Sequence, residues 1–243
     1  MNKQMQQLLG EVFGTFILVF LGAATVIGFG GQWAPFGFGI GLLAGLYAFG
    51  EMCGGHFNPI VSLALFLDRR LGARETIERW IAQFIGAVLA ALALLLMSSS
   101  DAVGKAATVP GIEGVRGAFF AEVFCSAIFV MVILHVTTSK IFASTTYVAI
   151  ALSLLAIHFA IIPFSGSSVN PARSFGTALI GNTWTDFWIY IIAPPIGAIL
   201  GWLIYTVVVK GNINLGDDLR AMKTDIAGAR GGPGTGSTGG AAS

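Results

Sequence analysis

The stretch FSGSSVNPARSFGTALIG (residues 164–181) places glycines, serines, an asparagine–proline pair and an arginine between two strongly apolar segments. Asparagine is a favoured helix N-cap and proline is favoured in the first helical turn, so Asn170 and Pro171 mark a helix start. A helix over 170–180 would rise about 15 Å, roughly half of the ~30 Å hydrocarbon core of a bilayer. Irregular backbone at membrane depth is tolerated only where it faces protein or a water-filled cavity. The stretch therefore predicts a re-entrant half-helix beside a pore.

The composition of the whole chain agrees with a membrane location. Of the 243 residues, 55% are hydrophobic and 10% are charged, whereas a soluble domain has roughly 25% charged residues. The mean hydropathy is +0.82. Six uncharged apolar runs approach or reach the ~20 residues that cross a bilayer as a helix: 12–29, 33–50, 80–97, 123–139, 141–162 and 187–209. The sequence predicts an all-α, multi-pass membrane protein with six transmembrane helices.

The distribution of basic residues predicts the orientation of these spans. Cytoplasmic connections carry an excess of lysine and arginine. One side of the predicted topology holds most of them, namely Lys3, Arg69, Arg70, Arg74, Arg79, Lys140 and Lys210. Lys105 and Arg116, on the other side, are a minority. Both termini are therefore expected in the cytoplasm, with the spans in the cell membrane.

The end of the chain differs in composition from the rest. Residues 211–243 are polar and then rich in glycine and serine, ending in GARGGPGTGSTGGAAS. Such a segment buries too little apolar surface to order itself. We expect a disordered cytoplasmic tail over 211–243.

The preceding part of the chain is an internal repeat. GEVFGTFILVF, from Gly10, matches AEVFCSAIFVM, from Ala121, and IAQFIGA matches IAPPIGA, both at a spacing of 111 residues. HFNPIVSLAL matches SVNPARSFGTAL at a spacing of 112. Each copy, 1–110 and 111–210, holds three spans, and an odd number of spans inverts the second copy in the membrane. Inverted repeats place the permeation path at their interface, near the bilayer midplane.

A second half-helix is predicted over 58–67, where Asn58 and Pro59 repeat the asparagine–proline pair. Two half-helices entering from opposite faces would bring Asn58 and Asn170 together at mid-membrane. Each helix N-terminus carries roughly half a positive elementary charge, which opposes cations and hydronium. The asparagine amides can donate hydrogen bonds to a passing oxygen, so a neutral polar solute is the expected cargo.

Three charged residues also fall at membrane depth. Arg173 lies one turn into the second half-helix, and an intramembrane arginine indicates a functional site. From there it can face the pore and repel cations. Glu11 and Glu122 occupy equivalent places in the two copies, and we expect them to accept hydrogen bonds from the re-entrant loops. This predicts a scaffold role for the two carboxylates.

With these motifs in place, the sequence resembles the aquaporin family, or major intrinsic proteins, over roughly its first 210 residues. The resemblance rests on GGHFNPI, SSVNPARS and the pair GEVF and AEVF. It implies a six-helix bundle with two half-helices, assembled as a homotetramer with one pore in each protomer. The paired pore motifs would be Asn58, Pro59 and Ile60 in the first copy and Asn170, Pro171 and Ala172 in the second.

The resemblance also implies a selectivity filter, carried over by spacing from the two motifs to Phe38, His158, Ser167 and Arg173. Glycerol facilitators of the family have Trp and Gly where this chain has Phe38 and His158. The bulkier pair implies a filter that passes water and excludes glycerol. The resemblance further implies that His56 lines the cytoplasmic half of the pore. One departure is Ile60, where the family usually has Ala.

The sequence thus predicts a passive, bidirectional water channel that is driven by osmotic gradients and excludes protons and ions. The alternatives are a facilitator of small neutral solutes such as glycerol and a structural membrane tetramer of low permeability. A coupled transporter would need carboxylates at the midplane, where none is found. No constellation of catalytic, metal-ligating or cofactor-binding residues appears, and no basic cluster suggests nucleic acid. The expected partners are water, lipid and further copies of the chain.

Overall fold

A computed structural model describes residues 1–212 and 215–230, and this part of the chain is built from helices without strands. Four short 3-10 or π-helical turns join or extend the helices: η1 (Gly31–Trp33), η2 (Leu46–Gly50), η3 (Lys140–Phe142) and η4 (Tyr205–Val209). The helices of the bundle are α1 (Lys3–Phe29), α2 (Ala34–Gly45), α3 (Glu51–Cys53), α4 (Pro59–Leu67), α5 (Ala73–Met97), α6 (Ser100–Lys105), α7 (Gly114–Val136), α8 (Thr146–Ser165), α9 (Pro171–Gly181) and α10 (Trp188–Ile204).

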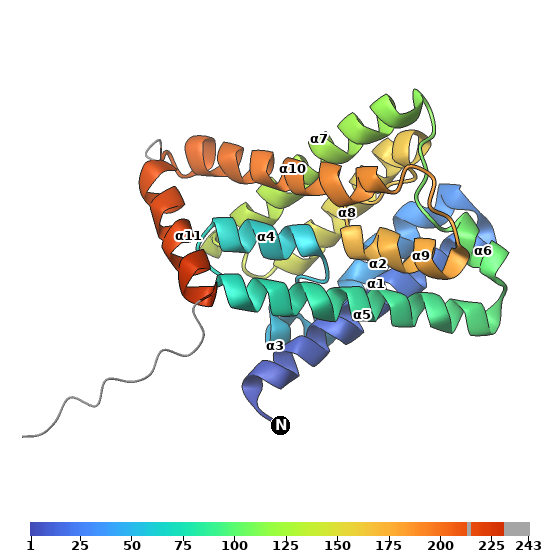
Figure 1. Cartoon of the computed structure of the whole chain (residues 1–243), viewed down its shortest axis with the longest axis horizontal. Helices are drawn as coiled ribbons and strands as arrows, with labels where there is room; N and C mark the ends of the chain where they lie inside the picture. Colours follow the sequence, from blue (N-terminus) through green and yellow to red (C-terminus); the bar gives the residue numbers. More distant parts are fainter. Residues whose placement is uncertain (213–214, 231–243) are drawn as a thin grey trace, which may run out of the picture.

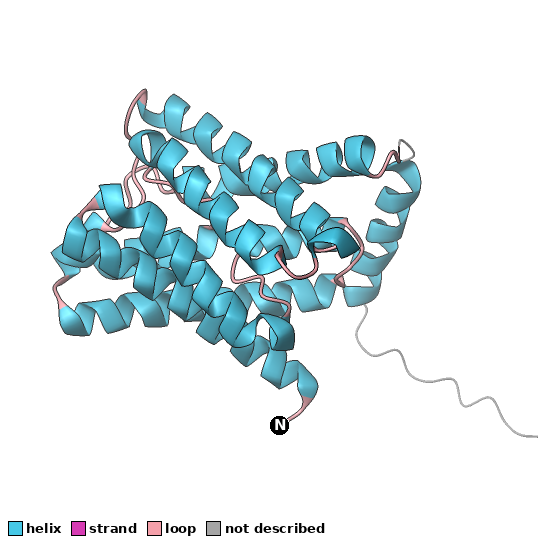
Figure 2. Ribbon diagram, turned by 180° about the vertical axis from the view of Figure 1, so that it is seen from behind, coloured by secondary structure: helices cyan, strands magenta, loops and turns pink. Residues whose placement is uncertain are grey.

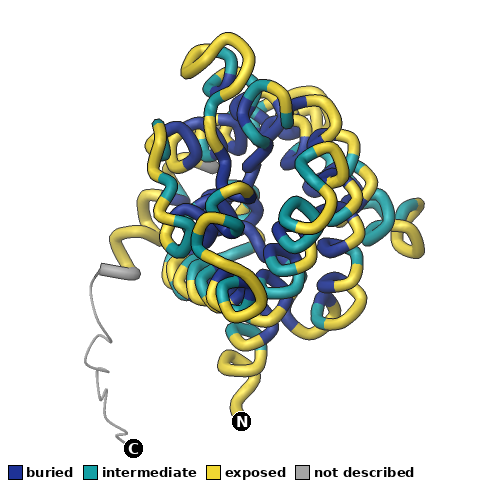
Figure 3. Tube along the Cα trace, turned by 90° about the vertical axis from the view of Figure 1, so that its right-hand side faces the viewer, coloured by how far each residue is buried: buried dark blue, intermediate teal, exposed yellow. Residues whose placement is uncertain are grey.

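The membrane spans follow the apolar runs of the sequence. Among the described residues, six helical segments are long and apolar enough to cross a bilayer, as predicted. Large apolar side chains point outward from them, as lipid-facing helices require, for example Ile40, Ile81, Phe124, Leu152, Phe159 and Ile192. Figure 3 shows the buried segments toward the centre of the bundle and the exposed segments around its outside. The bundle therefore has a buried centre and an apolar outer surface.

Several span boundaries differ from the predicted apolar runs. The first, third and fourth helices begin seven to nine residues earlier, at Lys3, Ala73 and Gly114. The fourth span ends at Val136 rather than at residue 139, and the hydroxyls of Thr137 and Thr138, just past this end, donate to the carbonyls of Ile133 and Leu134. The fifth begins at Thr146 rather than at residue 141, since the residues before it form the turn η3 and its connection. Hydropathy alone reveals neither the exact end of the fourth span nor the short turn η3.

The two repeats pack their outer helices in the same way. α1 packs on α5, and α7 packs on α10. A Cβ atom added at Gly86 would lie 2.2 Å from the carbonyl oxygen of Val12, and one at Gly197 would lie 2.3 Å from that of Val123. Each pair is separated by 111 residues, so both crossings depend on a glycine at the same repeat position. Small residues allow such close backbone approach between helices in membranes.

The half-helices α4 and α9 lie between these outer pairs. Figure 1 shows them end to end, with their N-terminal tips meeting at the centre and with α10 and α5 on either side. Figure 2 shows from behind that the irregular segments leading into them also run through the interior of the molecule. Both half-helices begin at the predicted asparagine–proline pairs, and α9 ends at Gly181, one residue beyond its predicted end.

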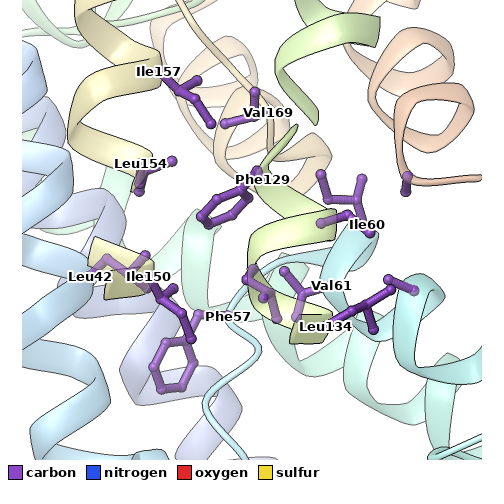
Figure 4. Close-up of a cluster of buried hydrophobic side chains, with 14 of the residues drawn as sticks. Leu42, Phe57, Ile60, Val61, Phe129, Leu134, Ile150, Leu154, Ile157 and Val169 are labelled. Carbon is purple, nitrogen blue, oxygen red and sulfur yellow. The ribbon is translucent and has the colours of Figure 1, made fainter. Parts of the chain in front are cut away.

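Apolar side chains from both repeats surround the half-helix tips. Figure 4 shows Ile60 and Val61 of α4 facing Phe129 of α7, with Leu154 of α8 and Leu42 of α2 opposite. These residues are buried, and together they form a rigid apolar wall on one side of the centre. Polar groups at the tips are therefore confined to the re-entrant backbone and a few side chains.

The tail contains one element that the sequence analysis did not expect. Residues Leu215–Arg230 form helix α11, which packs against α5. Met222 is buried in an apolar cluster that includes residues of α4, α7 and α10, and Asp225 accepts a hydrogen bond of 2.8 Å from the backbone N–H of Ala73. The structure has a helix over 215–230 where the sequence predicted disorder, and this helix is held by the burial of Met222 and by the bond of Asp225 to Ala73. Residues 213–214 and 231–243 of the predicted tail lie outside the described residues.

Candidate functional site

The tips of the two half-helices are tied to each other through their asparagines. The Asn58 side-chain oxygen caps α4 by accepting from the N–H of Ile60, and its amide nitrogen donates to the carbonyl of Val169 at 2.7 Å. Asn170 caps α9 in the same way and donates to the carbonyl of Phe57 at 2.9 Å. Each asparagine therefore fixes the loop that leads into the opposite half-helix.

The residue before each asparagine has an unusual backbone conformation. Phe57 has φ of +50° and Val169 has φ of +42°. A positive φ is rare for bulky and β-branched residues, and it persists only where the surroundings enforce it. Here a buried carboxylate holds each residue: Phe57 N–H donates to Glu11 at 2.8 Å, and Val169 N–H donates to Glu122 at 2.7 Å.

Glu11 and Glu122 each collect several donors from one re-entrant loop. Glu11 accepts from the backbone N–H of His56 as well as that of Phe57, and Glu122 accepts from the N–H of Ser168 as well as that of Val169. Both carboxylates are fully buried. They occupy equivalent positions on α1 and α7, and they satisfy loop donors that no helix or strand could satisfy.

Three side chains from different helices converge beyond the tips. The Phe38 and His158 rings, from α2 and α8, have centroids 4.9 Å apart, and the Arg173 guanidinium lies 4.5 Å from the centroid of Phe38. Gly22 of α1 makes room for Phe38, because a Cβ there would lie 2.2 Å from its ring. The arrangement is a tight constriction with one aromatic, one imidazole and one cationic wall.

The space at this constriction, here called the constriction cavity, is very small. Its volume is about 10 Å³, which is about the minimum that one water molecule needs. The Nε2 atom of His158 and the Nε atom of Arg173 are buried there without a hydrogen-bond partner in the described part of the chain. The lining residues are Leu18, Phe38, Leu42, His56, Asn58, Phe129, Leu154, His158, Ser168, Asn170 and Arg173.

Arg173 is held in place from the opposite side by a loop. Its guanidinium donates to the carbonyl of Ala106 at 2.8 Å, and the loop of Ala106 is fixed in turn by Thr108, whose hydroxyl donates to Ser174 at 2.8 Å. The sequence offered no signal for this anchor, because a backbone carbonyl can come from any residue type. With this bond to Ala106 in place, the guanidinium of Arg173 also contacts the ring of Phe38.

A second space continues from the constriction cavity and is here called the vestibule cavity. Its volume is about 230 Å³, and both cavities share Leu42, His56 and Phe129. His56 forms a hydrogen bond of 2.9 Å with Ser62 through its Nδ1 atom. The further lining residues are Leu46, Gly54, Gly55, Val61, Leu65, Arg70, Ile133, Thr137, Thr146, Tyr147 and Ile150. The two cavities form a path that starts beyond the half-helix tips and runs to the end of the bundle where α1 begins.

Comparison with known proteins shows which family this chain belongs to. A sequence profile described as MIP, major intrinsic protein, matches residues 1–205. The chain belongs to the major intrinsic protein family. Among its relatives, a protein named "Glycerol uptake facilitator protein-like 6" from Lactiplantibacillus plantarum is 41% identical over 209 residues, covering 81% of this chain and 94% of the relative. A protein named "Aquaporin Z" from Brucella melitensis is 36% identical over 220 residues, covering 83% of this chain and 96% of the relative.

The fold of this major intrinsic protein also matches a solved structure. The aquaglyceroporin from Plasmodium falciparum superposes with a TM-score of 0.78 at 22% sequence identity, covering 87% of this chain and 99% of that chain. The chain is therefore an integral multi-pass membrane channel of the aquaporin type, with six spans and two re-entrant half-helices in inverted repeats.

Arg79 of this major intrinsic protein does not lie in the connection where the sequence predicted it. The side chain is buried on α5, pairs with Glu11 at 2.9 Å and donates to the carbonyl of Cys53. At the equivalent position of the second repeat, the hydroxyl of Tyr190 donates to the carbonyl of Ser165 at 2.9 Å. Both residues tie down the start of a re-entrant loop, but the residue types differ, so the repeat comparison did not reveal them.

Two further predicted residues lie beside the constriction cavity without lining it. Ser167 is buried, and its hydroxyl has no hydrogen-bond partner among the described residues, whereas its neighbour Ser168 lines the cavity. Ile60 is buried in the apolar cluster drawn in Figure 4, and it lines neither cavity. The larger side chain at Ile60 is thus accommodated by packing. Among the described residues, no group of three or more metal-ligating side chains is found.

Proposed function

We propose that this chain is a passive water channel that conducts in both directions along an osmotic gradient. The observation that carries the proposal is the constriction formed by Phe38, His158 and Arg173, whose cavity of about 10 Å³ is about the size of one water molecule. The name of the Brucella relative, "Aquaporin Z", supports the same function. A solute wider than water would have to displace the rings.

The half-helix tips account for the exclusion of cations and protons in this proposal. An asparagine amide has two N–H donors, and in both Asn58 and Asn170 one of them is used by a loop carbonyl. The other donor serves the oxygen of a passing water. Two helix N-termini and the Arg173 guanidinium add positive potential around that water, which opposes hydronium and metal cations.

Stopped-flow light scattering on reconstituted liposomes tests the proposal. Under an impermeant osmolyte, we expect shrinkage well above that of empty liposomes and with a low activation energy. Under a glycerol gradient, we expect re-swelling no faster than in empty liposomes. Slow shrinkage from correctly folded protein would refute the water channel and favour a structural role.

Glycerol facilitation is the second candidate, and one observation favours it. The relative from Lactiplantibacillus plantarum, at 41% identity, carries the name of a glycerol uptake facilitator. The same glycerol gradient separates the two functions. Rapid re-swelling would show that the rings of Phe38 and His158 move apart to admit a three-carbon solute.

The proposal also includes the setting of the channel. We infer that the chain lies in the cell membrane with both termini in the cytoplasm, because the basic residues of the connections Arg69, Arg70, Arg74 and Lys140 lie on the side of the termini. The resemblance to the family implies a homotetramer with four separate pores. Chemical cross-linking and protease protection in sealed vesicles test these two statements.

A further inference from the structure

The vestibule cavity contains one charged side chain, that of Arg70, among the described residues that line it. Arg70 follows the C-terminal end of α4, and its guanidinium reaches across to the end of α7. There it donates to the hydroxyl of Thr137 at 2.9 Å, while that hydroxyl donates to the carbonyl of Ile133. The backbone N–H of Arg70 is bonded to the carbonyl of Leu65. The guanidinium is thus held at the outer end of the path.

The charges around Arg70 do not cancel. Asp68 lies 3.2 Å from the Nε atom of Arg70, and its other oxygen pairs with Lys210 at 2.5 Å. One carboxylate therefore serves two cations, which leaves the cluster of Arg70, Asp68 and Lys210 with a net charge of +1. Asp68 does not line the cavity, whereas Arg70 does. A permeating ion meets the cation of this cluster before the anion.

The two repeats differ at these positions. The residue equivalent to Arg173 in the first repeat is Val61, an apolar residue that lines the vestibule cavity. The residue equivalent to Arg70 in the second repeat is Asn182, which is uncharged. Each half of the path therefore contains one arginine, supplied from the start of α9 on one side and from the end of α4 on the other.

We propose that Arg70 is a second cation barrier, in series with Arg173, at the end of the path where the termini lie. The proposal rests on the channel function proposed above. Arg70 contributes positive potential at the vestibule cavity and so determines how strongly the channel rejects cations that enter from that side. In the intact channel Arg173 hides this contribution, because either barrier alone suppresses the cation flux.

The experiment removes the barriers singly and together in proteoliposomes. Proton leak is followed with an entrapped pH dye while a potassium diffusion potential drives it, and each value is divided by the water permeability of the same vesicles. We expect Arg173→Val to leak measurably, and Arg70→Gln combined with Arg173→Val to leak at least about tenfold more. The repulsion between a cation on the path and one unit charge about 8 Å away, at an effective dielectric constant of about 20, corresponds to a more than tenfold change in leak rate.

Two matched variants separate charge from shape. Arg70→Lys combined with Arg173→Val retains the charge, and its leak is expected within about twofold of Arg173→Val alone. Arg74→Ala combined with Arg173→Val removes an exposed arginine from the same connection, whose partner is Glu78, and should also leave the leak of Arg173→Val unchanged. Raising the ionic strength should reduce the effect of Arg70→Gln, since salt screens a charge at the mouth.

The outcomes are distinct. Equal leaks from Arg173→Val with and without Arg70→Gln would overturn the second barrier, as would a Lys variant that leaks like the Gln variant. If the Gln variant fails to conduct water, Arg70→Met is used in its place, with the same expected leak. A wild-type channel without water permeability would refute the proposed function itself, before any arginine is changed.

Discussion

The width of the path depends on three side chains, and the imidazole of His158 can be removed without removing the charge of Arg173. We expect His158→Ala to raise glycerol permeability about tenfold or more, because the ring that faces Phe38 at 4.9 Å would be gone while Arg173 stays. Liposome re-swelling under a glycerol gradient measures this. His135→Ala changes a histidine on α7 that lines neither cavity and serves as the control. Unchanged glycerol entry in His158→Ala would show that another residue sets the width.

The two cysteines provide a second test at the residue scale. Cys53 and Cys125 are buried, and neither lines the constriction cavity or the vestibule cavity. The predicted filter position has Ser167, which does not bind mercury. We expect micromolar mercurials to leave water permeability unchanged over minutes. Rapid block that Cys53→Ser or Cys125→Ser abolishes would place that thiol on the path.

Single residues were predicted either because the repeat shows them twice or, for Arg173, because a charge stands at membrane depth. Asn58 and Asn170, and likewise Glu11 and Glu122, were found because the same residue type fills both positions. Arg79 was misread because its counterpart Tyr190 donates to the equivalent carbonyl with a different chemical group. A single arginine looks the same in the sequence whether its side chain is exposed or buried. Only the packing of the folded protein distinguishes the two cases.

At the scale of the helices, the bundle depends on two close crossings. A side chain at Gly86 would collide with the carbonyl of Val12, as one at Gly197 would with that of Val123. Since a backbone atom cannot move aside as a side chain can, we expect Gly86→Leu to destabilise the protein by about 2 kcal/mol or more. The thermal midpoint of purified protein, followed by tryptophan fluorescence, measures this. Gly28→Leu, where a Cβ meets nothing within 4 Å, is the control and should change the midpoint little.

Helix boundaries show why elements were easier to predict than their ends. Long apolar runs gave all six spans, because length and hydropathy decide whether a helix crosses a bilayer. The half-helices were found through their start signals, Asn–Pro in both copies. The apolar run continues past the end of α7 at Val136, so hydropathy placed this end three residues too late.

At the scale of the whole molecule, removal of α11 would show whether water permeation needs the end of the chain. No described residue of α11 lines either cavity of the path, yet Asp225 caps α5 at Ala73 and Met222 is buried. We expect a chain ending at Asn212 to keep its water permeability and to lose about 1–2 kcal/mol of stability, the value of a lost cap and a partly lost apolar contact. Light scattering and the thermal midpoint measure the two effects. A changed permeability would show that α11 acts on the path.

The same helix explains where whole-chain prediction failed. The architecture of residues 1–210 could be predicted from the repeat, because each copy independently predicts three spans and one half-helix. The tail has no second copy, and its average composition hides the stretch 215–230 that forms helix α11. Composition does not register the contacts of α11 with the rest of the chain, namely the burial of Met222 and the bond of Asp225 to Ala73.

The crossed amide bonds at the centre of the molecule also concern its biosynthesis. Asn58 is fixed by a carbonyl that precedes α9, and Asn170 by one that precedes α4, so neither half-helix has its final partners until both repeats are in the bilayer. Translation delivers the first repeat more than a hundred residues before the second. The first re-entrant loop therefore lacks the partner of Asn58 until the segment around Val169 has been synthesised and inserted.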